Sequence, residues 1–570
     1  SRLAWGKKAA WWACAHLLST RKASRSPGVV AAAAMAVWRL LLFVWAAGAA
    51  SAWGADRDDL REEVAALRAE LAKVRHLAEQ HTTAEQDRRL SSQESAMTSS
   101  WLILCGSLAM FMHAGFAMLE AGTCRAKNAS NVLVKNLASL CVSTLGFYWT
   151  GYALAYGVRP DSTPQVSKGG NGFVGTAGWA GRGFNVDDLD GNVESTGHPL
   201  MWFFQWAFCS ASITIVSGAV AERVLSPAYC IFAFVMSAFI YPVVVAWTWG
   251  YGWISTLFDV GVVDFAGSGV VHVTGGVAGL VGTLVLGARR GRFPAWRAQP
   301  GEFDPHSLPL VVLGTFILWF GWNGFNCGST LEMNEEVGLL AAQVVMNTTI
   351  SAATGGLTVF FLRFLIMGAY DVCGMCNGIL AGLVSITAPC ANVEAGSAFS
   401  IGLIGAFVYQ AFSMLLVKLE VDDPLDAVPV HCFCGCWGIL AAAVFDWGNG
   451  FDHFHGNSGF HCMTDGDGNC ATGLFGKVIG AQIVMLLCII GWSSLFSGVT
   501  FLLLKKTGTL RIDEYTEESG VDAAKHCPAK AYAIPAVEYV SPGKSVTLSA
   551  SSSHSSKASS PDKDIATIEA

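Results

Sequence analysis

Long apolar runs dominate the chain between Trp101 and Leu504, and short polar loops separate them. A helix needs about 20 apolar residues to cross a bilayer, and helices satisfy their own backbone polar groups within lipid. The pattern therefore predicts an all-α polytopic membrane protein with eleven transmembrane helices. We place these spans at residues 99–120, 131–157, 199–220, 228–250, 264–287, 308–328, 337–362, 370–389, 398–418, 429–447 and 473–505.

The composition agrees with this pattern. The chain has 570 residues, of which 52% are hydrophobic and 14% are charged, whereas about 25% of the residues of a soluble domain are charged. Its 62 glycines suit close contact between helices in lipid. The net charge of −7 arises in loops and tails and says little about partners. From the apolar runs we expect a lipid bilayer as its surroundings, and we expect no nucleic-acid partner.

The basic residues predict the orientation. Lys and Arg gather in cytoplasmic loops, and the segments after the first, fifth and last spans contain Arg125, Arg289 and Lys505. An acidic loop with Glu332 falls on the opposite side. Because eleven is an odd number, the two ends of the membrane region lie on opposite sides, which gives an N-out, C-in topology.

The segments outside the spans have patterns of their own. Residues 1–55 hold an upstream extension and a signal-peptide pattern that starts at Met35, with a twelfth helix as the alternative. Residues 56–95 are charged and carry apolar residues at heptad spacing, which indicates either a short extracellular coiled coil or a solvated amphipathic helix. The main domain covers 99–507. A cytosolic tail follows at 508–570, and we expect its end to be disordered.

Two membrane segments each place an aspartate eight residues before a histidine: Asp264 before His272, and Asp423 before His431, with Asp426 as an alternative to Asp423. Eight residues of helix rise about 12 Å, so both histidines approach the midplane from opposite sides. An inverted repeat of five spans, with a final helix left over, produces this arrangement. A single buried histidine is more often satisfied by a neighbouring hydroxyl, but two in matched context favour proton transfer or the binding of a small polar solute.

Metal binding is the rival use of paired histidines, which can ligate haem iron or zinc. Cys432, Cys434 and Cys436 follow the second histidine, but a spacing of two spreads them around the helix axis. We therefore expect buried thiols and no cofactor. Cys462 and Cys470 fall in an outer loop, where a disulfide and two free thiols remain open alternatives.

Aromatic residues cluster at the ends of several spans. Trp322, Phe325 and Ser329 lie near the outer end of the sixth span, while Phe208 and Trp249 belong to the third and fourth. Aromatic belts occur at both interfaces of most membrane proteins. Tryptophan faces beside a serine hydroxyl can also hold a small cation by cation–π attraction.

Several motifs of this chain together resemble those of a known protein family. G-F-A-M-L-E-A-G, F-F-Q-W-A-F, G-A-V-A-E-R, D-F-A-G-S-G-V-V-H-V-T-G-G-V-A-G-L, W-F-G-W-N-G-F-N-C-G-S and C-N-G-I-L-A-G-L occur in this order. Together they resemble the ammonium transporters of the Amt/Mep/Rh family, over residues 99 to 530, and their wording is most similar to the plant-type branch. The resemblance implies a homotrimer of eleven-helix protomers, each with its own narrow hydrophobic pore for ammonium or ammonia.

The resemblance also implies roles for single residues. Trp249, Phe208 and Ser329 match an outer recruitment site for ammonium, and Asp264 matches an aspartate that supports that site without direct contact. Phe208 and Phe325 match a stacked phenyl gate.

His272 and His431 match the twin histidines of the pore, Trp322 matches a pore-lining tryptophan, and Asp423 occupies the place of Asp264 in the second repeat. Ammonium and potassium ions are similar in size, but only ammonium can shed a proton and cross a dry pore as neutral ammonia. The histidines can carry that proton by a separate path.

The segment L-R-I-D-E-Y-T-E-E-S-G-V-D-A-A-K-H resembles the family's regulatory C-terminus, so a cytosolic regulator is a candidate partner. Ala524 stands where plant-type members often carry a phosphorylatable threonine, which places that form of control in doubt. The resemblance favours a transporter rather than an enzyme, most naturally in the plasma membrane. An ammonium sensor, an electroneutral ammonia channel and a bis-histidine haem protein are the alternatives.

Overall fold

The computed structural model places most of the main domain and part of each flanking segment. The predicted signal peptide and the end of the tail lie outside the described residues, as does Cys462 of the predicted disulfide. The described residues are 57–157, 172–187, 193–195, 197–294, 299, 301–446, 463–464, 470–471, 475–528 and 531–532.

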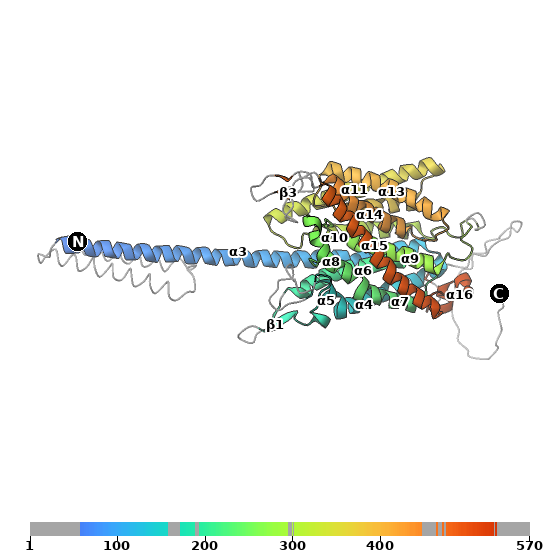
Figure 1. The fold of residues 1–570 in the computed structure, drawn as a ribbon, viewed down its shortest axis with the longest axis horizontal. Coiled ribbons are helices and arrows are strands. Elements are labelled where there is room, and N and C mark those ends of the chain that lie inside the picture. Colours follow the sequence, from blue (N-terminus) through green and yellow to red (C-terminus); the bar gives the residue numbers. More distant parts are fainter. Residues whose placement is uncertain are drawn as a thin grey trace, which may run out of the picture.

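The main domain is a bundle of roughly parallel helices (Figure 1). Several spans contain a π-helical turn, labelled η here, between or before α-helical parts. The elements of the bundle are α3 (Arg57–Thr123), α4 (Ala129–Gly146), η2 (Phe147–Gly151), α5 (Tyr152–Ala155), α6 (His198–Ala219), α7 (Ser226–Val235), η4 (Met236–Ile240), α8 (Tyr241–Trp247), η6 (Ser268–Val273), α9 (Thr274–Leu286), α10 (Leu308–Gly328), α11 (Glu335–Met367), α12 (Val372–Thr387), α13 (Ala395–Lys418), η8 (Val428–Phe433), α14 (Cys434–Phe445) and α15 (Phe475–Lys506).

Among the described residues, ten helices are long and apolar enough to cross a membrane. Each coincides with one of the predicted spans. The remaining predicted span, 370–389, is the apolar helix α12, which has only 16 residues. The helical membrane fold is therefore confirmed, and the count of eleven crossings stays a prediction.

Helix α3 is longer than a membrane span, with 67 residues. It continues without a break from the first span into the charged segment, and this extension projects away from the bundle (Figure 1). Because no glycine or proline occurs between Arg57 and Cys105, nothing in the sequence interrupts the helix at the membrane surface.

Short helices and strands occupy the loops. Helices α16 (Glu514–Ser519) and α17 (Val521–Lys525) lie at the end of the bundle opposite the α3 extension (Figure 1). The 3₁₀ helices are η1 (Ala126–Asn128), η3 (Trp179–Gly181) and η5 (Trp253–Asp259). Two antiparallel pairs of strands complete the list: β1 (Asn185–Asp187) with β2 (Val193–Ser195), and β3 (Met463–Thr464) with β4 (Cys470–Ala471).

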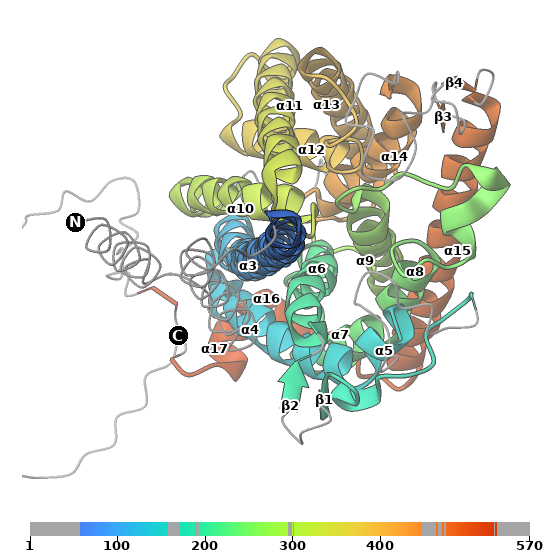
Figure 2. The ribbon, with the colours of Figure 1, turned by 90° about the vertical axis from the view of Figure 1, so that its left-hand side faces the viewer.

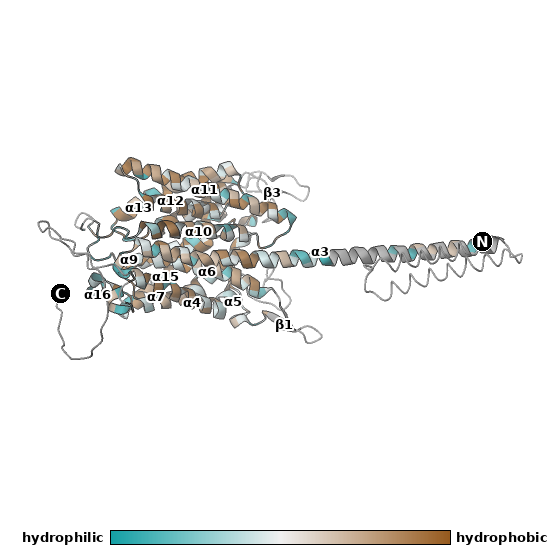
Figure 3. Ribbon diagram, turned by 180° about the vertical axis from the view of Figure 1, so that it is seen from behind, coloured by the Kyte–Doolittle hydropathy of each residue, from teal (hydrophilic) through white to brown (hydrophobic). Residues whose placement is uncertain are grey.

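The bundle is apolar outside as well as inside. Large side chains such as Phe316, Leu365 and Leu487 are 62%, 79% and 64% exposed. Hydrophobic residues cover the helices of the bundle, whereas hydrophilic residues gather near α16 (Figure 3). The end-on view shows α11 to α14 together on one side and α4, α5 and α7 on the other, with α3, α6 and α9 between them (Figure 2). The site lies among these central helices.

Candidate functional site

A cavity of about 410 Å³ lies beside the C-terminal end of α10. Trp101 of α3 donates a hydrogen bond from Nε1 to Oγ1 of Thr330 at 3.1 Å, which places this cavity at the end of the bundle from which α3 projects. Its lining contains all the residues that the resemblance assigned to the outer site, namely Trp249, Phe208, Ser329 and Asp264.

Hydrogen bonds fix the polar groups of this cavity. The indole Nε1 of Trp249 donates to the main-chain oxygen of Asp264 at 2.8 Å, and its ring meets the ring of Phe208 edge-on, with centroids 5.9 Å apart. The hydroxyl of Ser329 donates to the main-chain oxygen of Phe325 at 3.0 Å. Because that hydroxyl has used its hydrogen, Oγ is left as an acceptor, which suits a bound hydrogen-bond donor.

Two stacked rings close the cavity on the inner side. The rings of Phe208 and Phe325 lie 3.9 Å apart at an angle of 17°, and both side chains are buried. The ring of His272 follows, 5.8 Å from that of Phe325, and it stacks on Trp322 at 5.2 Å. The Nδ1 atoms of His272 and His431 are 3.1 Å apart, so the two histidines are in direct contact rather than merely near each other.

This contact determines what the histidine pair can offer. One Nδ1 must carry the hydrogen and the other must accept it. The ring that donates at Nδ1 then has an accepting Nε2, while its partner has a donating Nε2. A neutral pair therefore presents one donor and one acceptor to a molecule that lies beside it.

The first aspartate organises the segment that carries His272. Its carboxylate accepts hydrogen bonds from the backbone N–H groups of Gly267, Gly269 and Val270, at 3.1, 3.0 and 2.8 Å. These donors open the π-helical turn η6, where they have no partner within the helix. Asp264 thus positions both His272, through η6, and Trp249, through its main-chain oxygen.

The second aspartate builds the same arrangement. Asp423 accepts from the backbone N–H groups of Leu425 and Val428, at 3.3 and 2.6 Å, just before η8, which carries His431. The alternative, Asp426, instead accepts from the hydroxyls of Tyr409 and Ser413 at 2.8 Å each. The shared spacing of eight residues therefore corresponds to a shared local structure.

Glycines let these two segments touch. A Cβ at Gly276 of α9 would lie 2.3 Å from the backbone nitrogen of Cys432, and a Cβ at Gly435 of α14 would lie 2.7 Å from the main-chain oxygen of Ser268. Only a residue without a side chain allows backbones to approach this closely. The close crossing is what brings the two imidazoles within hydrogen-bond distance.

Two further spaces lie on the other side of the histidines. A cavity of about 20 Å³ is lined by His431 and by residues of α3, α6 and α12. A vestibule of about 270 Å³ follows, and its lining includes Arg363, Asp371 and Asp423. These features therefore follow one another through the bundle: first the outer cavity, then the phenyl pair, the histidine pair, the small cavity and the vestibule.

Comparison with known proteins gives the family. The profile described as "Ammonium Transporter Family" matches residues 100–532. The chain belongs to the ammonium transporter family. Ammonium transporter Amt2 of Archaeoglobus fulgidus is 39% identical over 438 residues, which cover 75% of this chain and 86% of that protein. Ammonium transporter 1 member 3 of Solanum lycopersicum is 38% identical over 455 residues, 76% of this chain and 94% of the relative.

Solved structures of similar proteins agree. A structure titled "Sensor Amt Protein" has a TM-score of 0.65 and 28% identity, and covers 76% of this chain and 99% of its own. Mep2 of Candida albicans has a TM-score of 0.61 and 26% identity, over 75% of this chain and 88% of its own. The protein is therefore a multi-pass membrane protein whose relatives are transporters rather than enzymes, as the motifs predicted.

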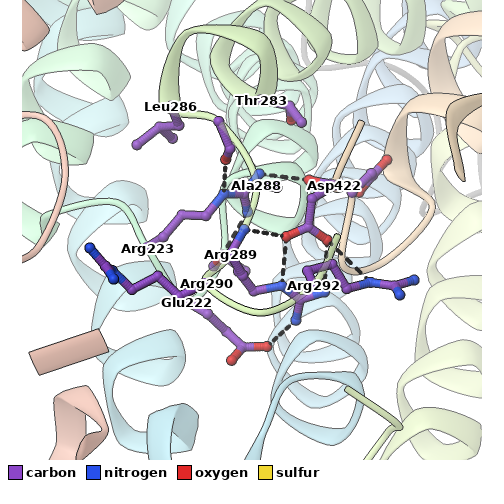
Figure 4. Close-up of polar contacts among 12 residues, drawn as sticks. Glu222, Arg223, Thr283, Leu286, Ala288, Arg289, Arg290, Arg292 and Asp422 are labelled. Atoms are coloured by element: carbon purple, nitrogen blue, oxygen red, sulfur yellow. Dashed lines mark hydrogen bonds and ion pairs between the residues drawn. The ribbon is translucent and has the colours of Figure 1, made fainter. Parts of the chain in front are cut away.

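The end of this ammonium transporter domain that lies beside α16 carries a buried charge cluster (Figure 4). Arg289 donates from its backbone nitrogen, Nε and Nη2 to the carboxylate of Asp422 at 2.8–2.9 Å, and it also pairs with Glu222. Burial opposes the charge of Glu222, but Arg289 and Arg125 outweigh burial and lower the pKa of this carboxyl. The pKa of Asp422 also falls below its usual range, because Arg289 outweighs burial.

The C-terminal segment packs beside this cluster, where Glu517 of α16 accepts a hydrogen bond from the backbone nitrogen of Arg290 at 2.8 Å. Asp522 of α17 accepts from the backbone N–H groups of Ser130 and Asn131, at 2.8 and 2.9 Å, at the start of α4. Glu517 of α16 pairs with Arg511 at 2.9 Å. The helical part of the predicted tail therefore docks on the same chain.

Reading the sequence missed one polar pair inside the bundle. Glu120 of α3 and Lys135 of α4 are both 1% exposed, and Nζ lies 3.6 Å from Oε2. The signal was present, since each is an isolated charge inside a predicted apolar span. Among the described residues, no group of three or more His, Cys, Asp or Glu side chains could hold a metal ion.

Proposed function

We propose that this protein transports ammonium across the membrane, recruiting the cation in the cavity of about 410 Å³ and conducting ammonia past the histidine pair. One observation carries the proposal: an aromatic cavity with an accepting serine oxygen leads through a stacked phenyl pair directly to two hydrogen-bonded histidines. Cation–π attraction to Trp249 and Phe208, together with a hydrogen bond to Ser329, supplies the chemistry that holds an ammonium ion.

The phenyl pair supplies selectivity. The rings of Phe208 and Phe325 have centroids 3.9 Å apart, so a cation that passes them leaves its water behind. The cost of removing a bare charge from water is many kcal/mol. Potassium cannot avoid this cost, whereas ammonium avoids it by leaving a proton behind. Beyond the rings, ammonia meets one donor and one acceptor on His272 and His431.

The histidine pair also offers a path for the proton. A hydrogen bond between two Nδ1 atoms at 3.1 Å lets a proton that arrives on one ring move to the other. Separate movement of ammonia and proton gives net transport of one positive charge per substrate. Asp264 acts as a positioning residue that holds Trp249 and the start of η6, and Asp423 does the same for η8.

We infer an N-out, C-in protein of the plasma membrane, with the outer cavity facing outward, because basic residues such as Arg289 gather at the opposite end. We also infer a homotrimer, in which the exposed apolar faces of the bundle contact neighbouring protomers as well as lipid. The segment 514–525 is then the docking place of a cytosolic regulator.

Uptake of labelled methylammonium by cells that express the chain tests this function. We expect uptake that excess ammonium inhibits and that equal excess potassium leaves unchanged. Absence of uptake, despite protein at the cell surface, would contradict the proposal. An unrelated membrane protein expressed at the same level is the control.

An ammonium sensor is the second candidate, because one structural neighbour with a TM-score of 0.65 is titled a sensor protein. A sensor binds ammonium in the same cavity without net uptake. Binding of ammonium that protects the purified protein from heat, combined with zero uptake, would favour the sensor.

A further inference from the structure

In the buried pair formed by Glu120 and Lys135, only one of the two carboxylate oxygens of Glu120 has a partner within the described part of the chain. Oε2 of Glu120 accepts a hydrogen bond from the hydroxyl of Ser217 at 2.8 Å and lies 3.6 Å from Nζ of Lys135. Lys135 donates in turn to the main-chain oxygen of Ser217 at 2.7 Å. Oε1 is buried and makes no hydrogen bond with the described residues. Leaving such an oxygen unpaired is costly, so its position needs an explanation.

The cavity of about 20 Å³ supplies one, because Glu120 and His431 both line it. A space of this size holds about one water molecule. Such a water needs two to four polar partners, and the lining contains four polar residues, namely Glu120, His431, Thr214 and Asn377. His431 is 4% exposed whereas His272 is fully buried, so His431 is the member of the histidine pair that this space can reach.

The small cavity also continues toward the far end of the bundle. Leu119, Asn377 and Leu425 line both this cavity and the vestibule of about 270 Å³. These shared residues place a water beside Glu120 next to the vestibule. A proton on Glu120 therefore stands one step from solvent.

We propose that Glu120 receives the transported proton from the histidine pair through one water in the small cavity. In this step the N–H bond at Nε2 of protonated His431 breaks, the proton passes to the water, and the water gives one of its own protons to Oε1 of Glu120. The histidine returns to its neutral form, the water is restored, and protonated Glu120 releases the proton to the vestibule. Lys135 and Ser217 hold Oε2 and leave Oε1 to accept. This role rests on the proposed transport function.

The competing explanation is a purely structural ion pair, and it predicts different behaviour for the variants Glu120→Gln and Glu120→Gln/Lys135→Gln. Loss of Glu120 alone leaves Lys135 buried without a counter-charge, which destabilises the protein. The double variant removes both charges and relieves that defect. If Glu120 is only structural, the double variant therefore recovers transport. If Glu120 is a proton acceptor, the double variant does not recover it.

The test measures charge and ammonia separately in proteoliposomes that contain the full chain. An ammonium jump gives the current, and an ammonia gradient followed by an internal pH dye gives the ammonia flux. We expect Glu120→Gln to lower the current by about tenfold or more, as loss of a proton-transfer group does, while the ammonia flux stays unchanged. We expect the double variant to keep the low ratio of current to flux. Glu120→Asp, which retains a carboxylate, should bring the ratio most of the way back to the wild-type value.

Two results would overturn the proposal. One is an unchanged ratio of current to flux in Glu120→Gln. The other is a joint fall of current and flux that the double variant restores. Failure of the proposed function looks different, because wild-type protein would then show no ammonium current or no ammonia flux at all.

Discussion

Replacing Asp264 tests how the site is held together. Three backbone N–H groups donate to its carboxylate at 2.8–3.1 Å, and each hydrogen bond to a charged group contributes about 1.5–3 kcal/mol. In Asp264→Asn an NH₂ group replaces one oxygen and faces an N–H group, so at least one of these bonds is lost. After allowing for the relief of no longer burying a charge, we expect a loss of about 2–4 kcal/mol in stability, and more for Asp264→Ala.

The control is Asp371→Asn, at the N-cap of α12. Asp371 accepts from one helical N–H group, that of Gly374 at 2.9 Å, and Asn serves as well as Asp at an N-cap. The variant therefore loses only the ion pair with Arg363 at 3.3 Å, at a cost of about 1 kcal/mol or less. Melting of the detergent-purified variants should give the order Asp264→Ala, Asp264→Asn, Asp371→Asn, from least to most stable. Ammonium current should fall in both Asp264 variants, because Trp249 and η6 lose their support. Equal melting of Asp264→Asn and Asp371→Asn would refute the reasoning.

Three further predictions concern the site and its surroundings. Trp249→Leu should raise the ammonium concentration for half-maximal current by about 5–30-fold, the equivalent of 1–2 kcal/mol of cation–π energy, and Trp249→Phe should raise it less. Gly276→Val should abolish transport by forcing α9 away from Cys432, while Gly396→Ala, where an added Cβ meets nothing within 4 Å, should leave the current unchanged. Asp422 has a lowered pKa in the folded protein, so its contribution to stability is complete above its unfolded value of about 4 and is lost as the pH falls below that value. The difference in melting temperature between wild type and Asp422→Asn should therefore shrink in acid, and a difference that grows there would contradict this account.

The sequence allowed the main features of the fold to be predicted for physical reasons. Lipid forces apolar side chains outward and backbone groups into helices, so spans can be recognised one by one from their own residues. The matched Asp264–His272 and Asp423–His431 spacings likewise predict a shared local structure, because an aspartate just before a helix finds free N–H groups wherever it occurs.

Contacts between distant segments could not be predicted in the same way. The hydrogen bond between the histidines depends on where Gly276 and Gly435 let two helices cross, and that crossing is a property of the packed bundle. Glu120 and Lys135 were overlooked because each charge was read within an otherwise apolar span. Their pairing becomes visible only when α3 and α4 lie side by side.

The most direct test of the account is the current carried by cells expressing the chain when ammonium and then potassium are added at equal concentration, with His272→Ala measured alongside. We predict an inward current with ammonium alone, and its loss or marked reduction in the variant at equal surface expression. A potassium current of similar size would contradict deprotonation at the phenyl pair. An ammonium current that His272→Ala leaves unchanged would contradict the role of the histidine pair.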